Sequence, residues 1–213
     1  MKTATEPGNI DVELMTIALT GDGRREQSLL KAFAERFNGN DFVLQLPAPV
    51  APLGHGNKLT GRFCGFSVLQ TIKTYVTKYK YSRYLFLIDS EHFKAEDLVS
   101  EIKSNLAGFD RVRITSLGDQ AFLICCNIGS HDLTIHVVVH GEEKCIEENI
   151  SKLILSEFGT SVKPIKSHID RFLRQNGSNL YMLIKNAKSA NLLQAFNDLS
   201  AAFSNMESIL HNC

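Results

Sequence analysis

Two pairs of acidic residues in this chain each follow an apolar run with the composition of a buried strand. Asp22 and Glu26 come after the run at 14–20, and Asp89 and Glu91 come directly after a second run. Loops beyond the carboxyl ends of parallel strands are where open α/β sheets hold ligands. Carboxylates that converge there repel one another unless a cation lies between them, and such oxygen ligands favour Mg²⁺ or Mn²⁺. The four acids therefore predict a divalent metal site.

The spacing within each pair suits such a site. Gly23 lets the backbone turn tightly after Asp22, and Glu26 then falls in the first turn of a helix, where the dipole stabilises a negative charge by about 0.3–1 kcal/mol. Asp89 and Glu91 are two positions apart, so their side chains point the same way if the strand continues. Structural alternatives are a turn or cap for Asp22, an ordinary helix-start acid for Glu26, and a helix cap for Asp89.

Charge is segregated along the chain although the formal net charge is zero. Residues 42–88 contain no Asp or Glu but carry six Lys or Arg residues, whereas residues 89–157 hold thirteen acids against six bases. Two surface fields of opposite sign are expected, and a phosphate-bearing partner such as a nucleic acid fits the basic one. The alternative is that these cationic side chains only solvate one face of a helix.

Length and composition indicate one large domain, or a domain with a modest extension. With 213 residues and 44% hydrophobic side chains, the chain can bury a full core. The five cysteines are odd in number and form no CxxC pair, which argues against a disulfide framework or a structural zinc module and favours a reducing compartment. Residues 1–9 lack the apolar segment of a secretion signal, and no apolar stretch approaches the roughly 20 residues that span a bilayer. We therefore expect a soluble, cytoplasmic protein with no membrane partner.

Hydrophobic periodicity predicts alternating strands and helices in the first two thirds of the chain. The expected strands are 14–20, 42–46, 83–88 and 111–116, and the expected helices are 25–37, 66–79 and about 94–107. Because each crossover must pack back on the sheet with the same hand, this order predicts a parallel sheet with covering helices. The stretch at 47–61 is rich in Pro and Gly and is expected to be a long loop.

The remaining segments predict additions to this sheet. Two apolar strands, 121–127 and 133–139, follow without an intervening helix and have the pattern of a hairpin appended to the sheet. A helix is expected at about 145–157, and the last part, 161–213, is expected to be mostly helical. We thus predict a Rossmann-like α/β core at 1–160 with the helical extension packed on it.

The order of these motifs resembles a known family. The first motif is a strand followed by an acid, Gly23, two residues and a second acid, and a later strand has an acidic D-x-D-like end. This order is similar to that of the TOPRIM domain of topoisomerases, bacterial primases and OLD-type nucleases. The chain looks closest to the small stand-alone TOPRIM-like proteins of prokaryotes. Their glycine-rich loop is similar to residues 54–58, and their later acidic helix start is similar to residues 145–148. The resemblance spans roughly residues 14–150 and implies a TOPRIM-like fold.

The resemblance implies divalent-metal-dependent cleavage or transfer of phosphodiester bonds in nucleic acid. Asp89, Glu91 and Asp22 would hold Mg²⁺ or Mn²⁺, with Asp22 also a candidate general acid or base. Glu26 would complete the acidic catalytic set, and Glu147 is a weaker candidate.

The long loop supplies the phosphate contacts that the resemblance implies. Lys58 and Arg62 lie on or beside this loop and would position a substrate without reading its sequence. His55 lies between glycines in the same loop and is a further candidate, with a plain surface loop as the alternative.

Two further histidines have the spacing of a helical zinc pair but not the sequence of a helix. Three valines separate His136 from His140 and indicate a strand. Along a strand the two imidazoles lie roughly 13 Å apart, so one metal cannot bridge them. His140 can still line a cleft at the strand end, or it can be an ordinary structural histidine.

Two departures from the family pattern keep other functions open. Asp22 stands where the family usually has Glu, and Glu91 stands where the second motif normally ends in Asp. Each exchange keeps the charge but changes the reach, and Mg²⁺ requires ligand distances of about 2.0–2.1 Å. The alternatives are a non-catalytic metal- or nucleic-acid-binding module that keeps the fold, and an enzyme that acts on a phosphorylated small molecule. The sequence distinguishes neither DNA from RNA nor a monomer from a homodimer.

Overall fold

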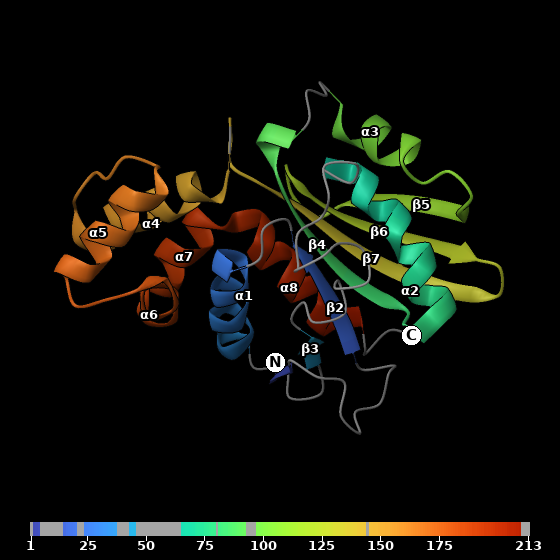
Figure 1. Cartoon of the computed structure of the whole chain (residues 1–213), viewed down its shortest axis with the longest axis horizontal. Helices are drawn as coiled ribbons and strands as arrows, with labels where there is room; N and C mark the ends of the chain where they lie inside the picture. The colour runs from blue at the N-terminus through green and yellow to red at the C-terminus, as the bar shows by residue number, and fades with distance from the viewer. Residues whose placement is uncertain are drawn as a thin grey trace.

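A seven-stranded sheet forms the centre of the described structure, and five of its strands run parallel (Figure 1). The computed structural model describes residues 2–4, 15–20, 24–37, 43–45, 65–79, 81–92, 97–143 and 145–209. In the order in which they lie in the sheet, the strands are β1 (Lys2–Ala4), β3 (Val43–Gln45), β2 (Met15–Thr20), β4 (Arg83–Asp89), β7 (His131–His140), β6 (Ala121–Ile128) and β5 (Asp110–Ser116). The described helices are α1 (Arg24–Arg36), α2 (Ile72–Tyr79), α3 (Leu98–Ser104), α4 (Ile146–Phe158), α5 (Lys166–Gln175), α6 (Leu180–Asn186), α7 (Ser189–Ala195) and α8 (Asn197–Ile209), with the 3₁₀ turns η3 (Gly65–Thr71) and η4 (Ser90–His92).

The predicted α/β architecture with a parallel sheet is confirmed for the strands that precede β5. β2, β3 and β4 fall where the apolar runs predict strands, and α1 and α2 fall where helical periodicity predicts helices. β4 is buried from Tyr84 to Ile88, as expected for a strand in the middle of a parallel sheet whose two faces are covered by helices. β1, which pairs with β3, is a strand that the periodicity does not indicate.

Two expectations about the second half of the sheet are wrong. The strand at 111–116 is not parallel, because β5 pairs antiparallel with β6 at the edge of the sheet. β6 and β7 do form a hairpin, but it is not an appendage, because β7 pairs parallel with β4 in the middle of the sheet. β7 is buried on both faces from Ile135 to His140, whereas every residue of β5 is exposed or half-buried. A strand that is apolar on both faces needs helices on both sides, and only a central position provides them.

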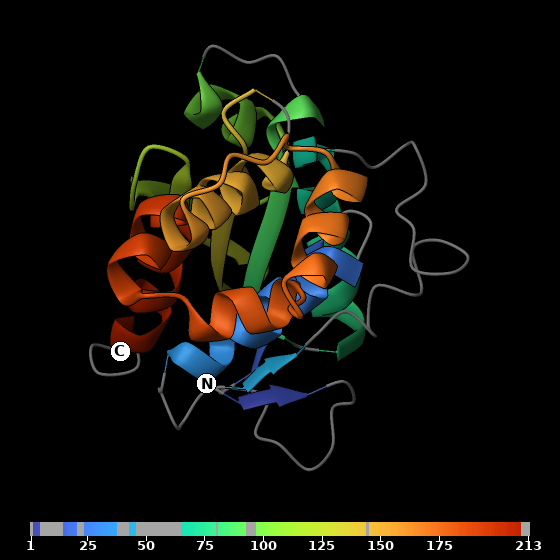
Figure 2. The ribbon, with the colours of Figure 1, turned by 90° about the vertical axis from the view of Figure 1, so that its left-hand side faces the viewer.

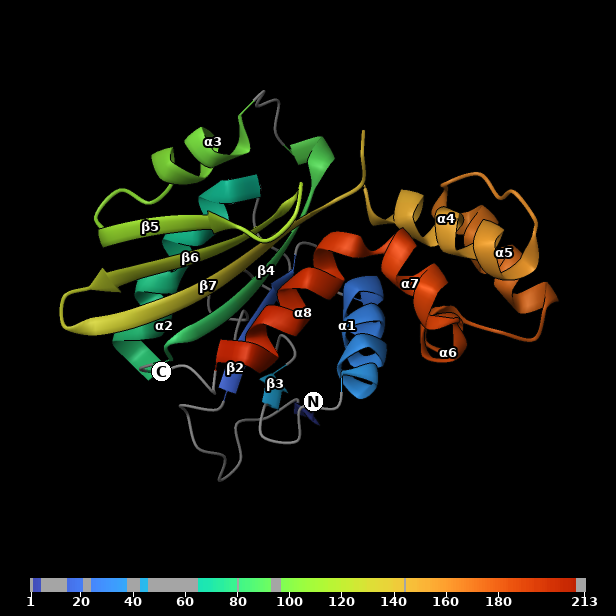
Figure 3. The same ribbon diagram turned by 180° about the vertical axis from the view of Figure 1, so that it is seen from behind.

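Helices cover both faces of the sheet. On one face, Tyr84 and Phe86 of β4 belong to a buried cluster with Tyr75 of α2 and Ile102 of α3. On the other face, Leu85 belongs to a cluster that includes α1 and the helices from α4 to α8. Figure 1 shows α2 in front of the sheet, and the rear view in Figure 3 shows α8 and α1 against the opposite face.

The helices that follow β7 pack into the same buried cluster as α1 (Figure 2). The segment at 161–213, which is expected to be mostly helical, contains α5 to α8, and Phe196 separates α7 from α8. Phe196 leaves the helical conformation and is buried edge-on against Phe33 of α1, with ring centroids 5.5 Å apart. Arg36, the last residue of α1, donates a hydrogen bond of 2.7 Å to the carbonyl of Ala187 at the end of α6. These contacts fix α1 against the later helices, and α1 carries one side of the candidate site.

Candidate functional site

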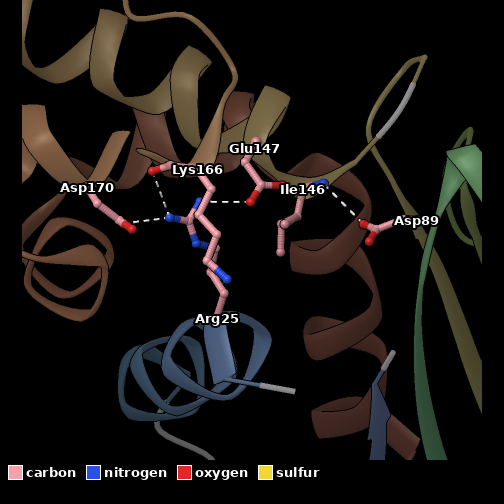
Figure 4. Close-up of polar contacts among 6 residues, drawn as sticks. All are labelled: Arg25, Asp89, Ile146, Glu147, Lys166 and Asp170. Atoms are coloured by element: carbon pink, nitrogen blue, oxygen red, sulfur yellow. Dashed lines mark hydrogen bonds and ion pairs between the residues drawn. The ribbon is translucent and has the colours of Figure 1, made fainter. Parts of the chain in front are cut away.

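Asp89, the last residue of β4, lies at the carboxyl edge of the parallel strands and contacts the start of α4 (Figure 4). Its Oδ1 accepts a hydrogen bond of 3.1 Å from the backbone N–H of Ile146, the first residue of α4. Cys145, which occupies the N-cap position, makes no side-chain cap hydrogen bond. The Asp89 carboxylate therefore caps α4 from another element, where the helix dipole favours its negative charge.

The tight connection between β7 and α4 brings this helix start next to Asp89. Gly141 has a φ of +80°, a conformation that favours glycine. A Cβ at this position would lie 2.5 Å from the backbone nitrogen of Cys145 and 2.7 Å from its carbonyl oxygen. Asn149 of α4 accepts a hydrogen bond of 3.0 Å from the Gly141 N–H through its side-chain oxygen. Because β7 pairs with β4, this turn fixes the position of α4 relative to Asp89.

Burial and three neighbouring acids raise the pKa of Asp89 from 3.8 to about 7. Burial has the largest effect, and the hydrogen bond from the Ile146 N–H opposes it. The negative charges of Glu26, Glu147 and Glu91, in that order, raise the pKa further. At neutral pH the carboxyl is therefore divided between its protonated and ionised forms, so it can accept or release a proton there.

Glu26 and Glu91 differ in their placement around Asp89. Glu26 lies in the first turn of α1, as its spacing after the preceding strand predicts, and is only 7% exposed. Glu91 lies in η4, which follows β4 directly, and is exposed. Because the strand ends at Asp89, the alternation that would point Asp89 and Glu91 the same way does not apply. Glu26 is thus a buried neighbour of Asp89, and Glu91 acts on it from the solvent side.

Arg25 joins three helices beside these acids (Figure 4). Its guanidinium group donates to a Glu147 carboxylate oxygen at 2.9 Å, to an Asp170 carboxylate oxygen at 2.5 Å and to the Lys166 carbonyl at 3.3 Å. The side chains of Arg25 and Glu147 are 8% and 14% exposed, whereas that of Asp170 is 45% exposed. The pair with Glu147 is therefore nearly buried, and its loss would leave an uncompensated charge, while solvent screens the pair with Asp170. Arg25 holds Glu147 in one orientation.

Cys145 and His140 lie beside Asp89 but carry no charge at neutral pH. Burial, reinforced by the hydrogen bond to Glu147, raises the pKa of the Cys145 thiol to about 12, so the thiol is not activated as a nucleophile. His140 pairs with Asp89 in the register of β7 and β4 and is 3% exposed. Its Nε2 has no hydrogen-bond partner among the described residues, and its ring lies edge-on to Phe196. Burial lowers the pKa of His140 to about 4, so the ring is a neutral imidazole.

His136 lies on the same strand as His140, as the valines between them predict. Its Nε2 is hydrogen-bonded to the side-chain oxygen of Asn205 in α8 at 2.8 Å. Burial lowers the pKa of His136 to about 4, and this ring is part of the packing between β7 and α8.

The described structure brings together some of the predicted site residues. Four others lie outside the described residues: Asp22, His55, Lys58 and Arg62. Glu26, Asp89 and Glu147 come together from α1, β4 and α4. Across the same described ranges, no three Asp, Glu, His or Cys side chains are placed to hold one metal ion. A metal site here therefore needs a further ligand, and Asp22 belongs to the short connection between β2 and α1.

Arg25 and Asp170 are site residues that the sequence motifs do not single out. The partners of Arg25 are 122 and 145 residues away in the chain, so no local pattern links them. One signal was available, because Arg25 precedes Leu29 and Phe33 at helical spacing and both of these side chains are fully buried. An arginine at the start of a buried helical stripe requires a buried acidic or carbonyl partner.

Comparisons of the chain with protein-family models, with curated proteins and with solved structures find no match. The resemblance to TOPRIM domains therefore depends on the motif residues of this chain alone. Of the helices in the described ranges, none combines the length and the apolar character needed to cross a membrane.

Proposed function

We propose that this protein cleaves or transfers phosphodiester bonds in nucleic acid with Mg²⁺ or Mn²⁺ at the acidic cluster of Glu26, Asp89 and Glu147. The observation that carries the proposal is the place of Asp89, which ends β4, caps α4 and lies near Glu26 of α1 and Glu147 of α4. Its raised pKa, about 7, agrees with this arrangement. Buried carboxylates with this surplus of negative charge are stabilised when a cation binds between them. Asp89 also ends β4, the parallel neighbour of β2, at the edge where open α/β sheets bind ligands.

In this proposal each acid has a separate task. Asp89 would hold the divalent ion together with Asp22, the acid in the connection between β2 and α1. When bound, the ion stabilises the negative charge that develops on the attacking and leaving oxygens. Asp89 would release its proton as the ion binds, because a nearby positive charge lowers the pKa of a carboxyl group. Glu26 keeps the site negative, and Arg25 orients Glu147 through their ion pair of 2.9 Å.

A second candidate is a non-catalytic module that keeps the fold and binds a divalent ion at the same acids, or nucleic acid elsewhere on its surface. One observation favours it over catalysis. Arg25 already compensates the charge of Glu147, so that carboxylate is not free to take part in the reaction. Such a module would bind without cleaving.

Incubation of the purified protein with single- and double-stranded DNA and RNA, in Mg²⁺, in Mn²⁺ or in EDTA, separates the two candidates. We expect cleavage products with either ion and none in EDTA. Asp89→Asn, which keeps an acceptor for the Ile146 N–H, is expected to lower the rate at least about a hundredfold. Asp119→Asn, which removes an exposed acid between β5 and β6, is the control and is expected to leave the rate unchanged. Ion binding by an unaltered chain that cleaves none of these substrates would establish the second candidate instead.

A further inference from the structure

A cavity of about 530 Å³ lies among β5, β6 and β7 at the antiparallel end of the sheet. Arg113, Cys125 and Thr134 line it and lie opposite one another on these adjacent strands, so their side chains stand on one face of the sheet. His136, two residues beyond Thr134 on the same face, contacts Asn205 of α8. The three side chains therefore stand on the face that α8 covers, beyond the part that α8 reaches. Figure 3 shows β5, β6 and β7 extending past α8 on that side.

A second arginine, which lies at a β-bulge in the edge strand, lines the same cavity. Asp110 pairs with Asn127 and Arg113 pairs with Cys125, so β5 has one more residue than β6 between these pairs. Arg111 lies in this bulge with a φ of +51°, the one positive φ at a non-glycine residue in the described part of the chain. Such a conformation is strained, and it persists only where the surrounding structure requires it. Arg111 and Arg113 both line the cavity.

Both arginines are available to a ligand. Arg111 and Arg113 are exposed, and within the ranges that the structure describes neither side chain takes part in a hydrogen bond or an ion pair. The Arg25 side chain, in contrast, donates three hydrogen bonds to carboxylate and carbonyl oxygens. Asp132, the acid that lines the cavity, accepts a hydrogen bond from the Asn127 side chain and keeps its negative charge, because the amide is neutral. Two guanidinium groups and one carboxylate give the cavity lining a net charge of +1, and neither guanidinium group is paired with that carboxylate.

We propose that this cavity binds backbone phosphates of a nucleic acid. Guanidinium groups bind phosphate oxygens through paired hydrogen bonds, and the Thr134 hydroxyl and Asn127 amide add donors of the kind that contact phosphates. Among the described residues that line the cavity, none is aromatic, so it offers no platform on which a base could stack. The phosphate backbone, not the bases, is therefore the matching ligand.

The inference rests on the proposed function, because it takes the nucleic acid substrate as the ligand. Thr134 pairs with Arg83 of β4, and Asp89 follows Arg83 by six residues, which places the two sites about 20 Å apart along the strands. A nucleic acid that contacts both sites is thus bound by the cavity at a point far from the bond that is cleaved at the acidic cluster. Contacts of this kind position a substrate without reading its sequence.

Nucleic-acid binding in EDTA tests the inference separately from cleavage. Labelled single strands and duplexes long enough to span both sites are titrated with protein at several NaCl concentrations, and binding is followed by fluorescence anisotropy. The double variant Arg111→Gln/Arg113→Gln is expected to bind at least about tenfold more weakly. Its plot of log K against log salt is expected to be less steep, by about 1.4 in the magnitude of the slope for single strands and about 1.8 for duplexes. The charge-matched control Lys163→Gln/Arg171→Gln removes two exposed cations at α5 and just before it and is expected to bind like the unaltered chain.

Several results would overturn the inference. Unchanged affinity and salt dependence in the double variant would do so, as would an absence of binding by the unaltered chain. Self-association of the double variant with unchanged affinity would show that Arg111 and Arg113 only protect the exposed edge of β5 from pairing with another strand. If the unaltered chain binds through these arginines but cleaves no substrate, the proposed function fails and the cavity assignment stands.

Alkylation of Cys125 provides a second readout at the cavity itself. Cys125 is a free, half-buried thiol that lines the cavity, whereas its neighbour Cys126 is buried. Bound nucleic acid is expected to slow the alkylation of Cys125, as followed by peptide mass mapping, and the double arginine variant is expected to lose this protection. Equal alkylation rates with and without saturating nucleic acid would contradict the assignment.

Discussion

Replacement of Asp89 by Asn is expected to stabilise the protein when no divalent ion is present. The folded state holds this carboxyl with a pKa of about 7, against an ordinary value of 3.8. The folded state therefore binds the proton more tightly than the unfolded state does, and the carboxyl lowers the free energy of unfolding progressively as the pH rises from 3.8 to about 7. At a pH above both pKa values, this reduction in the free energy of unfolding is constant.

The magnitude follows from the pKa. A rise from 3.8 to about 7 corresponds to about 4 kcal/mol at 1.36 kcal/mol per pH unit. Asn keeps an oxygen that can accept the 3.1 Å hydrogen bond from the Ile146 N–H, so the cap of α4 is preserved. Burial of the new amide group offsets part of the gain. We therefore expect Asp89→Asn to raise the free energy of unfolding by about 2 kcal/mol at pH 8 and, because the cost of burying the amide does not depend on pH, to lower it by about 2 kcal/mol near pH 4.

Urea unfolding in EDTA at a series of pH values measures this difference. Asp119→Asn serves as the control for removal of an acid and is expected to follow the unaltered chain. An Asp89→Asn variant that is less stable than the unaltered chain at pH 8 would refute the reasoning, because ionised Asp89 would then have a favourable partner in the folded state. In saturating Mg²⁺ the gain is expected to shrink or reverse, since only the unaltered chain acquires the full binding free energy of the ion.

Three further perturbations test the surroundings of the site, each by urea unfolding. Gly141→Ala is expected to lower the free energy of unfolding by at least about 2 kcal/mol more than Gly129→Ala, because both glycines have positive φ but only at Gly141 would a Cβ meet backbone atoms. Arg25→Met is expected to lower it by about 2–4 kcal/mol by leaving a nearly buried glutamate unpaired, whereas Lys152→Met, which removes an exposed pair, is expected to change it by less than about 0.5 kcal/mol. If the two glycine variants lowered the free energy of unfolding equally, the crowding at Gly141 would be contradicted. If Arg25→Met and Lys152→Met lowered it equally, the burial of the Arg25 ion pair would be contradicted. Burial lowers the pKa of His136 from 6.5 to about 4, so stability is expected to fall as the pH decreases through that range, by up to about 3 kcal/mol, and His136→Gln is expected to lose this part of the pH dependence. An unchanged pH profile in that variant would show that other groups cause it.

The elements of the fold were more predictable from the sequence than their partners. β2, α1 and β4 are visible because apolar residues repeat with a fixed period inside each segment. The apolar residues of 131–140 indicate a strand covered on both faces, but nothing local to this segment identifies β4 as its partner in a central position. That position depends on helices that cover both of its faces, and α8, which contacts His136, comes much later in the chain. Strand pairing is therefore a property of the whole core, which a local pattern does not contain.

The candidate site was predictable residue by residue, but its assembly was not. Glu26 and Asp89 are indicated because each follows a strand, whereas Glu147 is indicated only by the family resemblance. The proximity of these acids depends on the turn at Gly141, where the sequence shows only a glycine. The ion pairs of Arg25 link positions 122 and 145 residues apart, and only the folded arrangement, in which the Arg25 side chain reaches from α1 to α4 and α5, brings them together.

An aspartate at position 89 is poorly suited to a purely structural role as the cap of α4. Asn, which has the shape of Asp, would accept the Ile146 N–H without a charge to bury. The aspartate instead lowers stability at neutral pH, and Glu26 and Glu147 increase that loss by raising its pKa. A fold that needed only the cap would gain from a neutral residue, so the charge is advantageous only if it interacts with something that binds there. The proposed divalent cation has a charge that would match this cluster, and a variant that gained stability while losing the binding of that cation would carry the usual sign of a functional site.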